Sequence, residues 1–291
     1  MDVTVRPMAE ADVDGAAAVQ INGFDDHDRR FGDDVPETTP ERVEQVRRRI
    51  RHLLANDPDG SWVATADGNV VGLALALKRK QLWGLSLLVV DPQLQSGGVG
   101  RRLLAAALTY AEPDAPAVIL SSRDPRAMRL YAGAGFDLHP QVRANGVVAT
   151  SRLRMPELPV RDGTPADFDL ADAVDVAVRG APHGPDHTSL ASRGPMFVVD
   201  AGERRGYAYL RGGGVSALAA TDEVTATALL WRCLAAVADA GVNAEVDHIA
   251  GNQQWAIRVA VDAGLLFTPA GPVMWRGSSP PAAYLPSGAY L

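Results

Sequence analysis

The stretch LSLLVVDPQLQSGGVGRRLL, residues 85–104, decides the fold of this chain. It opens with a short apolar run, residues 85–90, whose leucines and valines predict a buried β-strand. Asp91 and Pro92 end the strand, because proline cannot donate a hydrogen bond to a neighbouring strand. A glycine-rich loop follows, and it leads directly into a helix predicted over residues 101–111.

This order of strand, glycine loop and helix is one way in which a backbone binds phosphate. The first N–H groups of a helix have no partner inside the helix and carry partial positive charge. Gly97, Gly98 and Gly100 allow successive N–H groups to point into one concavity. Arg101 and Arg102 add full positive charge at its rim. The alternative interpretation is a glycine-rich turn that only connects a strand to a helix.

The spacing of the glycines separates this loop from other phosphate loops. It lacks the Lys-Ser/Thr ending of a P-loop, and the G-x-G-x-x-G pattern of dinucleotide sites does not fit. The pattern that fits is Q-x-x-G-x-G, formed by Gln95, Gly98 and Gly100. Together with a preceding strand that ends in Val90-x-Pro92, it resembles the acyl-CoA pyrophosphate loop of GNAT-type N-acetyltransferases.

A second motif follows after another predicted strand. Asp124 and Pro125 predict a helix start, with aspartate as the N-cap and proline at the first position. Tyr131 stands seven residues after the cap, and Gly135-Phe136 ends the helix and begins a strand. This segment is similar to one in GNAT proteins, although the family commonly has asparagine where this chain has Asp124.

The resemblance implies a binding mode for acetyl-CoA. In the family two strands splay apart, and the pantetheine lies in the gap like an added strand, with backbone amides holding the pyrophosphate. The expected cofactor-binding residues are Leu88, Val89, Val90, Gln95, Ser96, Gly97, Gly98, Val99, Gly100, Arg101, Arg102 and Asp124.

The resemblance also implies direct transfer of the acetyl group from the thioester to an amine in a ternary complex. Holding both reactants together removes much of the entropic barrier. Tyr131 is expected to protonate the departing thiolate, a role that suits a phenol within hydrogen-bond reach. The alternative is that Tyr131 is a packed aromatic side chain on an amphipathic helix.

An acidic insert around residues 23–40 follows a helix predicted to end near Ile21. The phosphate-loop strand contains no glutamate, so the general base is sought in this insert. The candidates are Asp26, His27, Asp28, Asp33 and Asp34. We expect Asp26, His27 and Asp28 to contact the amine substrate from an acidic lid. The alternative is a solvated, mobile loop.

Weak internal repeats indicate two copies of one α+β domain, each a mixed α/β sheet flanked by helices. Arg6 and Asp12 recur as Arg161 and Asp167, and further echoes follow in the same order. On the resemblance, these are two tandem GNAT-like domains. The expected parts are a catalytic domain at 1–156, a second domain at 157–276 and a Pro/Gly-rich tail at 277–291.

The second copy lacks the residues that suggest cofactor binding. Residues 219–225 read AATDEVT where the first copy has its glycine loop, so Asp222 and Glu223 stand where phosphate would bind. Val259 replaces the tyrosine that corresponds to Tyr131. We therefore expect a degenerate copy that braces the first domain or shapes the acceptor pocket.

Composition narrows the functional classes. The 291 residues are 47% hydrophobic and carry a net charge of −7, which argues against a nucleic-acid partner. No apolar run is long enough to span a membrane, and the single cysteine, Cys233, favours the cytoplasm. His183 and His187 lack convincing metal-binding spacing, so we expect a surface or structural role for them and no metal.

These observations predict an acetyl-CoA-dependent N-acetyltransferase that acts on a small-molecule amine, with no metal, nucleic acid or membrane involved. The alternative is a non-catalytic acyl-CoA-binding sensor or scaffold. The identity of the amine, the acyl-chain preference and the oligomeric state stay open.

Overall fold

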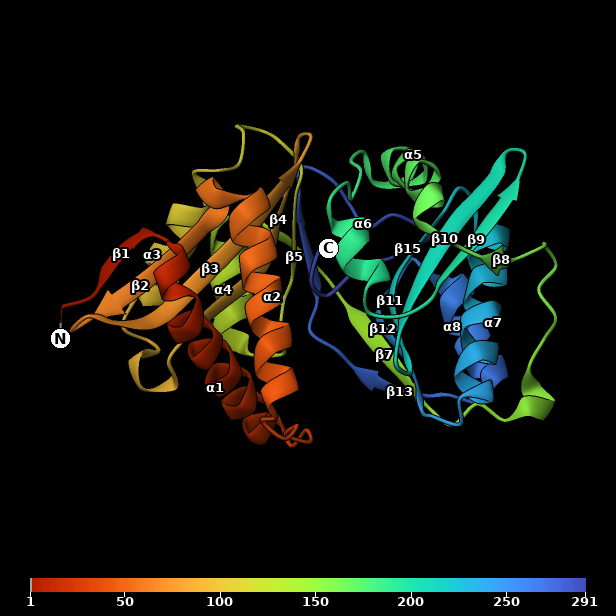
Figure 1. The fold of residues 1–291 in the computed structure, drawn as a ribbon, viewed down its shortest axis with the longest axis horizontal. Helices are drawn as coiled ribbons and strands as arrows, with labels where there is room; N and C mark the ends of the chain where they lie inside the picture. Colours follow the sequence, from red (N-terminus) through yellow and green to blue (C-terminus); the bar gives the residue numbers. More distant parts are fainter. Residues whose placement is uncertain (1) are drawn as a thin grey trace. The chain divides into compact units, whose positions relative to one another are not determined.

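A computed structural model describes residues 2–291. The chain forms two compact units, Met1–Ala115 and Pro116–Leu291, and each is described by itself (Figure 1). The elements of the first unit are β1 (Thr4–Pro7), η1 (Glu10–Asp12), α1 (Val13–Phe31), α2 (Pro40–Asn56), η2 (Pro58–Gly60), β2 (Ser61–Ala66), β3 (Asn69–Arg79), β4 (Leu82–Val90), η3 (Pro92–Leu94) and α3 (Val99–Leu108).

The second unit contains more strands than the first. Its elements are β5 (Ala117–Leu120), α4 (Pro125–Gly133), β6 (Asp137–His139), β7 (Gln141–Gly146), η4 (Thr150–Arg152), β8 (Arg161–Asp162), η5 (Pro165–Asp167), α5 (Phe168–Arg179), α6 (Asp186–Ala191), β9 (Met196–Ala201), β10 (Arg204–Arg211), β11 (Gly214–Ala220), α7 (Glu223–Asp239), β12 (Ala244–Ala250), α8 (Gln254–Ala263), β13 (Leu266–Pro269), β14 (Val273–Arg276) and β15 (Tyr284–Leu285).

In the first unit, β1 to β4 pair in sequence order as an antiparallel sheet. Helices α1 and α2 lie on one face of this sheet and α3 lies on the other (Figure 1). Because both faces are covered, β3 and β4 are buried along most of their length. This explains why the sequence of β4 is a nearly continuous apolar run rather than an alternating one.

The internal repeat predicted from the sequence is present in atomic detail. In the first copy, the guanidinium of Arg6 makes two hydrogen bonds of 2.7 Å with the Asp12 carboxylate. In the second copy, Arg161 does the same with Asp167, at 2.9 and 2.5 Å. Each aspartate also accepts a backbone N–H from three residues earlier, at 2.8 Å. The predicted mixed α/β class and the two-copy architecture are confirmed.

Both copies also carry a β-bulge at the same serine. The register of β3 and β4 shifts so that Ser86 is the extra residue of β4, and the register of β10 and β11 shifts likewise at Ser216. A bulge bends its strand and frees a backbone group from the ladder. In the first copy the freed Ser86 carbonyl accepts a hydrogen bond from Arg49 at 2.6 Å.

The C-terminal strands of the two copies are exchanged within the second unit. Strand β7 lies before the linker in sequence, yet it pairs with β12 and β13 of the second copy. Strand β14 lies near the end of the second copy, yet it pairs with β5 and β6 of the first. The proposed sequence domains, 1–156 and 157–276, therefore each give one strand to the other's sheet.

The tail is packed in the second unit rather than extended into solvent. Strand β15 pairs with β11 at Leu218 and Ala219. These residues follow Gly214 and Val215, the two residues of β11 that pair with β12. Strand β15 also contacts β12. Side chains of α8 and the turn before it hold the tail, with Asn252 and Trp255 donating to tail carbonyls at 2.8 and 2.7 Å. Across the described residues 2–291, no helix combines the length and apolarity that crossing a bilayer requires.

Candidate functional site

The phosphate-loop candidate begins where β4 ends at Val90. The Asp91 carboxylate accepts the backbone N–H of Gln93 at 2.9 Å and so caps the 3-10 turn η3. The side-chain amide of Gln95 then donates to the Val90 carbonyl at 3.1 Å. These two contacts fix the start of the loop against the end of the strand.

The loop turns by two residues in the left-handed region. Ser96 has φ 67° and Gly98 has φ 82°, and α3 begins immediately afterwards at Val99, two residues earlier than the sequence predicted. Gly98 is the N-cap residue, and no side chain caps the helix. The first N–H groups of α3 therefore have no side-chain acceptor, which leaves partial positive charge for an anion.

The equivalent helix of the second copy is closed by its own carboxylate. Asp222 accepts the backbone N–H of Thr225 at 2.9 Å and its hydroxyl at 2.8 Å. A negative charge therefore already occupies the start of α7, where an anionic ligand would have to bind.

The other predicted loop and strand residues differ in exposure. Leu88 is half-buried, whereas Val89 and Val90 are buried in β4. Arg101 is exposed, and Arg102 donates to the backbone carbonyl of Val3 at 2.7 Å. Arg102 is therefore partly engaged within the protein, while Arg101 is available at the rim.

Asp124 and Tyr131 lie on α4, in the second compact unit, whereas the loop lies in the first. As predicted, Asp124 caps α4 through the N–H of Arg126 at 2.8 Å. The Arg126 guanidinium also pairs with this carboxylate at 2.6 Å. Tyr131 is 5% exposed, and burial, with a smaller contribution from Asp124, raises the pKa of its phenol. The phenol therefore keeps its proton at neutral pH.

The first half of the acidic insert is helical rather than a loop, while its predicted contact with the substrate stays a prediction. Helix α1 continues to Phe31 and ends at Gly32, which has a left-handed φ of 73°. Asp26, His27 and Asp28 are therefore on the last turns of a helix rather than in a loop. The ion pair from Asp26 to Arg30 at 2.9 Å, one helical turn apart, stabilises this extension.

His27 faces β4. Gly23, one turn earlier on the same face of α1, lies so close to β4 that a Cβ atom added there would be 2.3 Å from Cγ2 of Val89. Gln20 belongs to the same face. Within the described residues, the buried atoms Nε2 of His27 and Oε1 of Gln20 have no hydrogen-bond partner, although His27 Nδ1 lies 3.3 Å from the Asp28 carboxylate.

The neighbouring helix α2 also reaches β4. Arg49 donates to both the carbonyl and the hydroxyl of Ser86, at 2.6 and 2.8 Å. The sequence did not single out Gln20 or Arg49, because a glutamine or arginine on an amphipathic helix looks like an ordinary surface residue. The packing of Gly23 shows that the face of α1 with Gln20 turns towards β4. The hydrogen bonds to the bulged Ser86 show the same for the face of α2 with Arg49.

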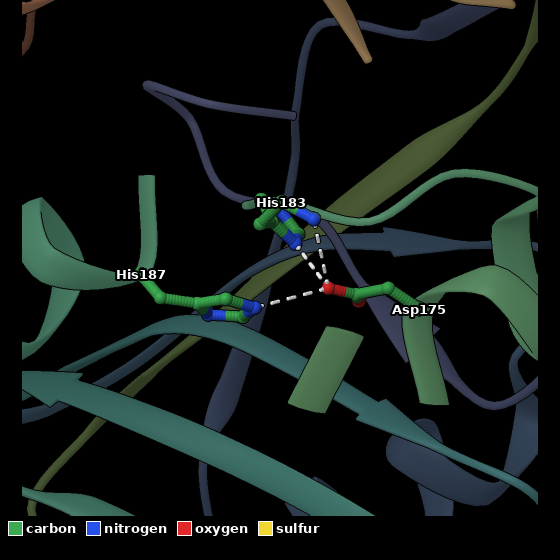
Figure 2. Close-up of side chains that lie close together, drawn as sticks. All are labelled: Asp175, His183 and His187. Carbon is green, nitrogen blue, oxygen red and sulfur yellow. Dashed lines mark hydrogen bonds and ion pairs between the residues drawn. The ribbon is translucent and has the colours of Figure 1, made fainter. Parts of the chain in front are cut away.

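Burial of two histidines of the second copy excludes the surface role that was one of the two expected for them, and leaves the structural one. His183 and His187 were expected in a surface or structural role, and both are completely buried. With Asp175 they form the cluster in Figure 2. By contrast, Cys233 is buried in the core as expected, and burial raises the pKa of its thiol to about 12.

Comparisons with known proteins show which proteins this chain resembles. Residues 28–151 match the family model of the acetyltransferase (GNAT) domain. The chain is 28% identical over 123 residues to an uncharacterised N-acetyltransferase of Archaeoglobus fulgidus, covering 40% of this chain and 74% of that protein.

Solved structures resemble nearly the whole chain. A putative acetyltransferase from Pyrococcus horikoshii superposes with a TM-score of 0.73 at 17% identity, over 99% of this chain and 95% of that one. A tandem GNAT protein from the clavulanic acid biosynthesis pathway superposes with a TM-score of 0.58 at 16% identity, over 96% and 99% of the two chains. At these identities the structures support the fold. Residues 28–151 therefore match an acetyltransferase (GNAT) domain, and the fold of the chain consists of two GNAT-like domains in tandem.

Proposed function

We propose that the N-terminal copy transfers an acetyl group from acetyl-CoA directly to a small-molecule amine. The observation that carries this proposal is the open start of α3, where Ser96 and Gly98 take left-handed conformations and no side chain caps the helix. Successive backbone N–H groups there match a pyrophosphate.

In this proposal the cofactor binds along β4 and the loop. The amides from Gln95 to Arg101 hold the pyrophosphate, with Arg101 adding charge. Main-chain groups of residues 88–90 bind the pantetheine and polarise the thioester carbonyl. Donors that are fixed in place before the reaction stabilise the developing oxyanion without reorganisation.

The amine then approaches from the face of α1 that packs on β4. If His27 Nδ1–H donates to Asp28, the lone pair of Nε2 is free to accept the proton of the attacking amine. This arrangement makes His27 the proposed general base. Gln20 Oε1, on the same face, is an acceptor for a second N–H of the amine, because both atoms are buried and without a partner in the described residues.

The reaction forms a carbon–nitrogen bond and breaks the carbon–sulfur bond of the thioester. The amine proton goes to His27, and, as the family resemblance implies, the departing CoA thiolate takes a proton from Tyr131. Burial raises the pKa of the Tyr131 phenol, so the phenol carries its proton at neutral pH.

We further propose that the C-terminal copy does not bind CoA. Its helix α7 is capped by Asp222. Strand β15 pairs with the part of β11 that follows the residues paired with β12. In the family, the gap between the corresponding strands takes the pantetheine. The tail therefore fills the groove of the second copy with the chain's own backbone.

The experiment that tests this function is an acetyl-transfer assay with purified protein, acetyl-CoA and a panel of amines, in which released CoA thiol is measured. The proposal expects turnover with at least one class of amine. CoA binding without turnover across small amines, polyamines, amino acids and peptide N-termini would favour the alternative, a non-catalytic acyl-CoA sensor.

A further inference from the structure

Three side chains of the second copy converge in its interior (Figure 2). Asp175 Oδ2 lies 2.8 Å from His183 Nδ1 and 3.5 Å from His187 Nε2. One ligand atom from each residue lies within 4.8 Å of the other two. All three side chains are 0% exposed, so the carboxylate is removed from water and requires compensating positive charge. The buried guanidinium of Arg179, which donates to the Leu291 oxygen, supplies one such charge.

The local fold brings these residues together over a short stretch of chain. Asp175 is on α5, which ends at Gly180 with a left-handed φ of 80°. The chain then reverses direction, so that His183 precedes α6 and His187 lies in its first turn. The sequence pattern is D-x7-H-x3-H, in which the aspartate looked like an ordinary position of an amphipathic helix.

Both ring nitrogens of His183 lie within hydrogen-bond distance of an oxygen, but a neutral ring has only one N–H to donate. Its Nε2 lies 2.9 Å from the oxygen of Leu291, and its Nδ1 lies 2.8 Å from Asp175 Oδ2. A neutral imidazole carries only one N–H. Whichever nitrogen is protonated, the other directs its lone pair at an oxygen. A second proton on the ring or a cation beside it removes this conflict.

The hydroxyl of Tyr207 does not resolve the conflict. It donates to Asp175 Oδ1 at 2.6 Å and lies 3.1 Å from His183 Nδ1. A phenol has one proton, so it cannot serve both atoms at once. With the proton on Asp175 Oδ1, the lone pair of His183 Nδ1 still faces Asp175 Oδ2.

We propose that Asp175, His183 and His187 bind a divalent transition-metal ion of the zinc class. The ligand atoms are Asp175 Oδ2, His183 Nδ1 and His187 Nε2. Two imidazole nitrogens and one carboxylate oxygen are a donor set that zinc prefers. At the usual bond lengths, tetrahedral ligand atoms are about 3.3 Å apart, close to the 2.8 and 3.5 Å found here.

The surroundings match the outer shell of a metal site. Metal-bound histidines usually donate their second ring N–H to an oxygen, which fixes the tautomer. Here the second nitrogen of His183 faces the Leu291 oxygen at 2.9 Å, and that of His187 faces the Tyr209 hydroxyl at 3.0 Å. The free oxygen of Asp175 accepts the Tyr207 hydroxyl. Each ligand is thus oriented by a separate buried group.

Asp172 marks the side on which the fourth ligand would enter. Its Oδ1 is 3.1 Å from His187 Nε2, and its side chain is 34% exposed. Asp172 is therefore a partly exposed residue in contact with the buried cluster. A metal here would cross-link the end of α5 to α6, so its role is structural and independent of acetyl transfer.

The test measures metal directly in the full-length protein, purified without a metal-affinity tag and stripped with a chelator. Titration with Zn²⁺ against a chromophoric chelator is expected to give one tight site, and Co²⁺ is expected to give the visible spectrum of a tetrahedral ion. His187→Ala should abolish this site. His248→Ala, which changes another histidine of the same unit outside the cluster, should leave it intact.

A second variant keeps all three ligands and guards against loss of folding. Tyr209→Phe removes only the hydroxyl that faces His187, and we expect it to weaken Zn²⁺ binding roughly 10-fold. The absence of a stoichiometric Zn²⁺ or Co²⁺ site in wild-type protein would overturn the proposal and assign the missing charge to a second proton on His183. Unchanged Zn²⁺ affinity in folded His187→Ala would overturn it equally. Neither result depends on acetyl-transfer activity.

Discussion

Gly23 of α1 lies directly against Val89 of β4, so closely that a Cβ atom at position 23 would be 2.3 Å from Cγ2 of the valine. No real Cβ atom makes so short a contact, so only glycine permits this approach of helix to strand. The contact turns towards β4 the helical face that carries Gln20, Gly23 and His27, and β4 is the strand that we propose binds the thioester.

Gly23→Ala tests this contact. The added methyl group must push α1 away from β4, and overpacking of this kind costs about 1–3 kcal/mol in the free energy of unfolding, measurable with urea. Gly133→Ala is the control, since Gly133 is also helical and has nothing within 4 Å of the added atom. The control should be neutral or slightly stabilising. Equal effects of the two variants would contradict the close packing.

His27→Ala tests the proposed base. Loss of general-base catalysis lowers kcat/KM by roughly 10²–10⁴-fold, while calorimetric affinity for CoA should be unchanged. Arg29→Ala is the matched control, because Arg29 is an exposed residue of the same helix that has no part in the proposed site. A His27→Ala enzyme with wild-type kcat/KM would rule out this base.

Tyr131→Phe tests the proposed acid. The substitution removes one buried hydroxyl and keeps the ring, so we expect kcat to fall roughly 10²-fold or more with little change in CoA affinity. Tyr110→Phe removes a hydroxyl that lies 3.3 Å from Asp57 in the first unit and should leave kcat nearly unchanged. If Tyr131→Phe retains full kcat, the tyrosine is a packing residue.

The ion pair of Arg161 and Asp167 makes stability depend on pH. The Arg161 guanidinium lowers the pKa of Asp167 from 3.8 to about 2, so the folded state gains stability above pH 4 and loses it as pH falls towards 2. Because Arg161 is 51% exposed, solvent screening reduces the gain to about 1 kcal/mol. Unfolding of Asp167→Asn should be about 1 kcal/mol easier at pH 7.

The comparison that checks this prediction is the pH dependence itself. Between pH 4 and 2, the Asp167→Asn protein should lose less stability than wild type. Asp162→Asn removes a carboxylate that is 79% exposed and should follow the wild-type curve. Parallel curves for wild type and Asp167→Asn would mean that the ion pair contributes no net stability.

The sequence predicted the features that local chemistry determines. Pro92, Gly98 and the cap at Asp124 act over a few residues, and each has the predicted structural role, whereas Gly100 lies inside α3 rather than in the loop. The repeat was also visible, because Arg6 and Asp12 recur with the same spacing as Arg161 and Asp167. The functions assigned to these residues stay predictions.

Features that depend on distant contacts were not predictable. The sequence does not reveal the exchange of β7 and β14. Each strand pairs with an equivalent sheet edge in the other copy, so the exchange leaves its local β-strand pattern unchanged. The continuation of α1 to Phe31 was hidden, because an acidic stretch is as typical of a loop as of an exposed helix. Asp175 is an aspartate among apolar helix residues, and only folding shows that two histidines meet it.

The most direct test of the central claim is calorimetric titration of CoA into wild-type, Gly98→Val and Gly202→Val proteins. Gly98 and Gly202 both have left-handed φ angles, 82° and 69°, so valine strains both backbones, but only Gly98 borders the open start of α3. We predict that wild type and Gly202→Val bind one CoA with similar affinity and that Gly98→Val binds at least roughly tenfold more weakly. No binding by wild type, or equal affinity in folded Gly98→Val, would contradict the account.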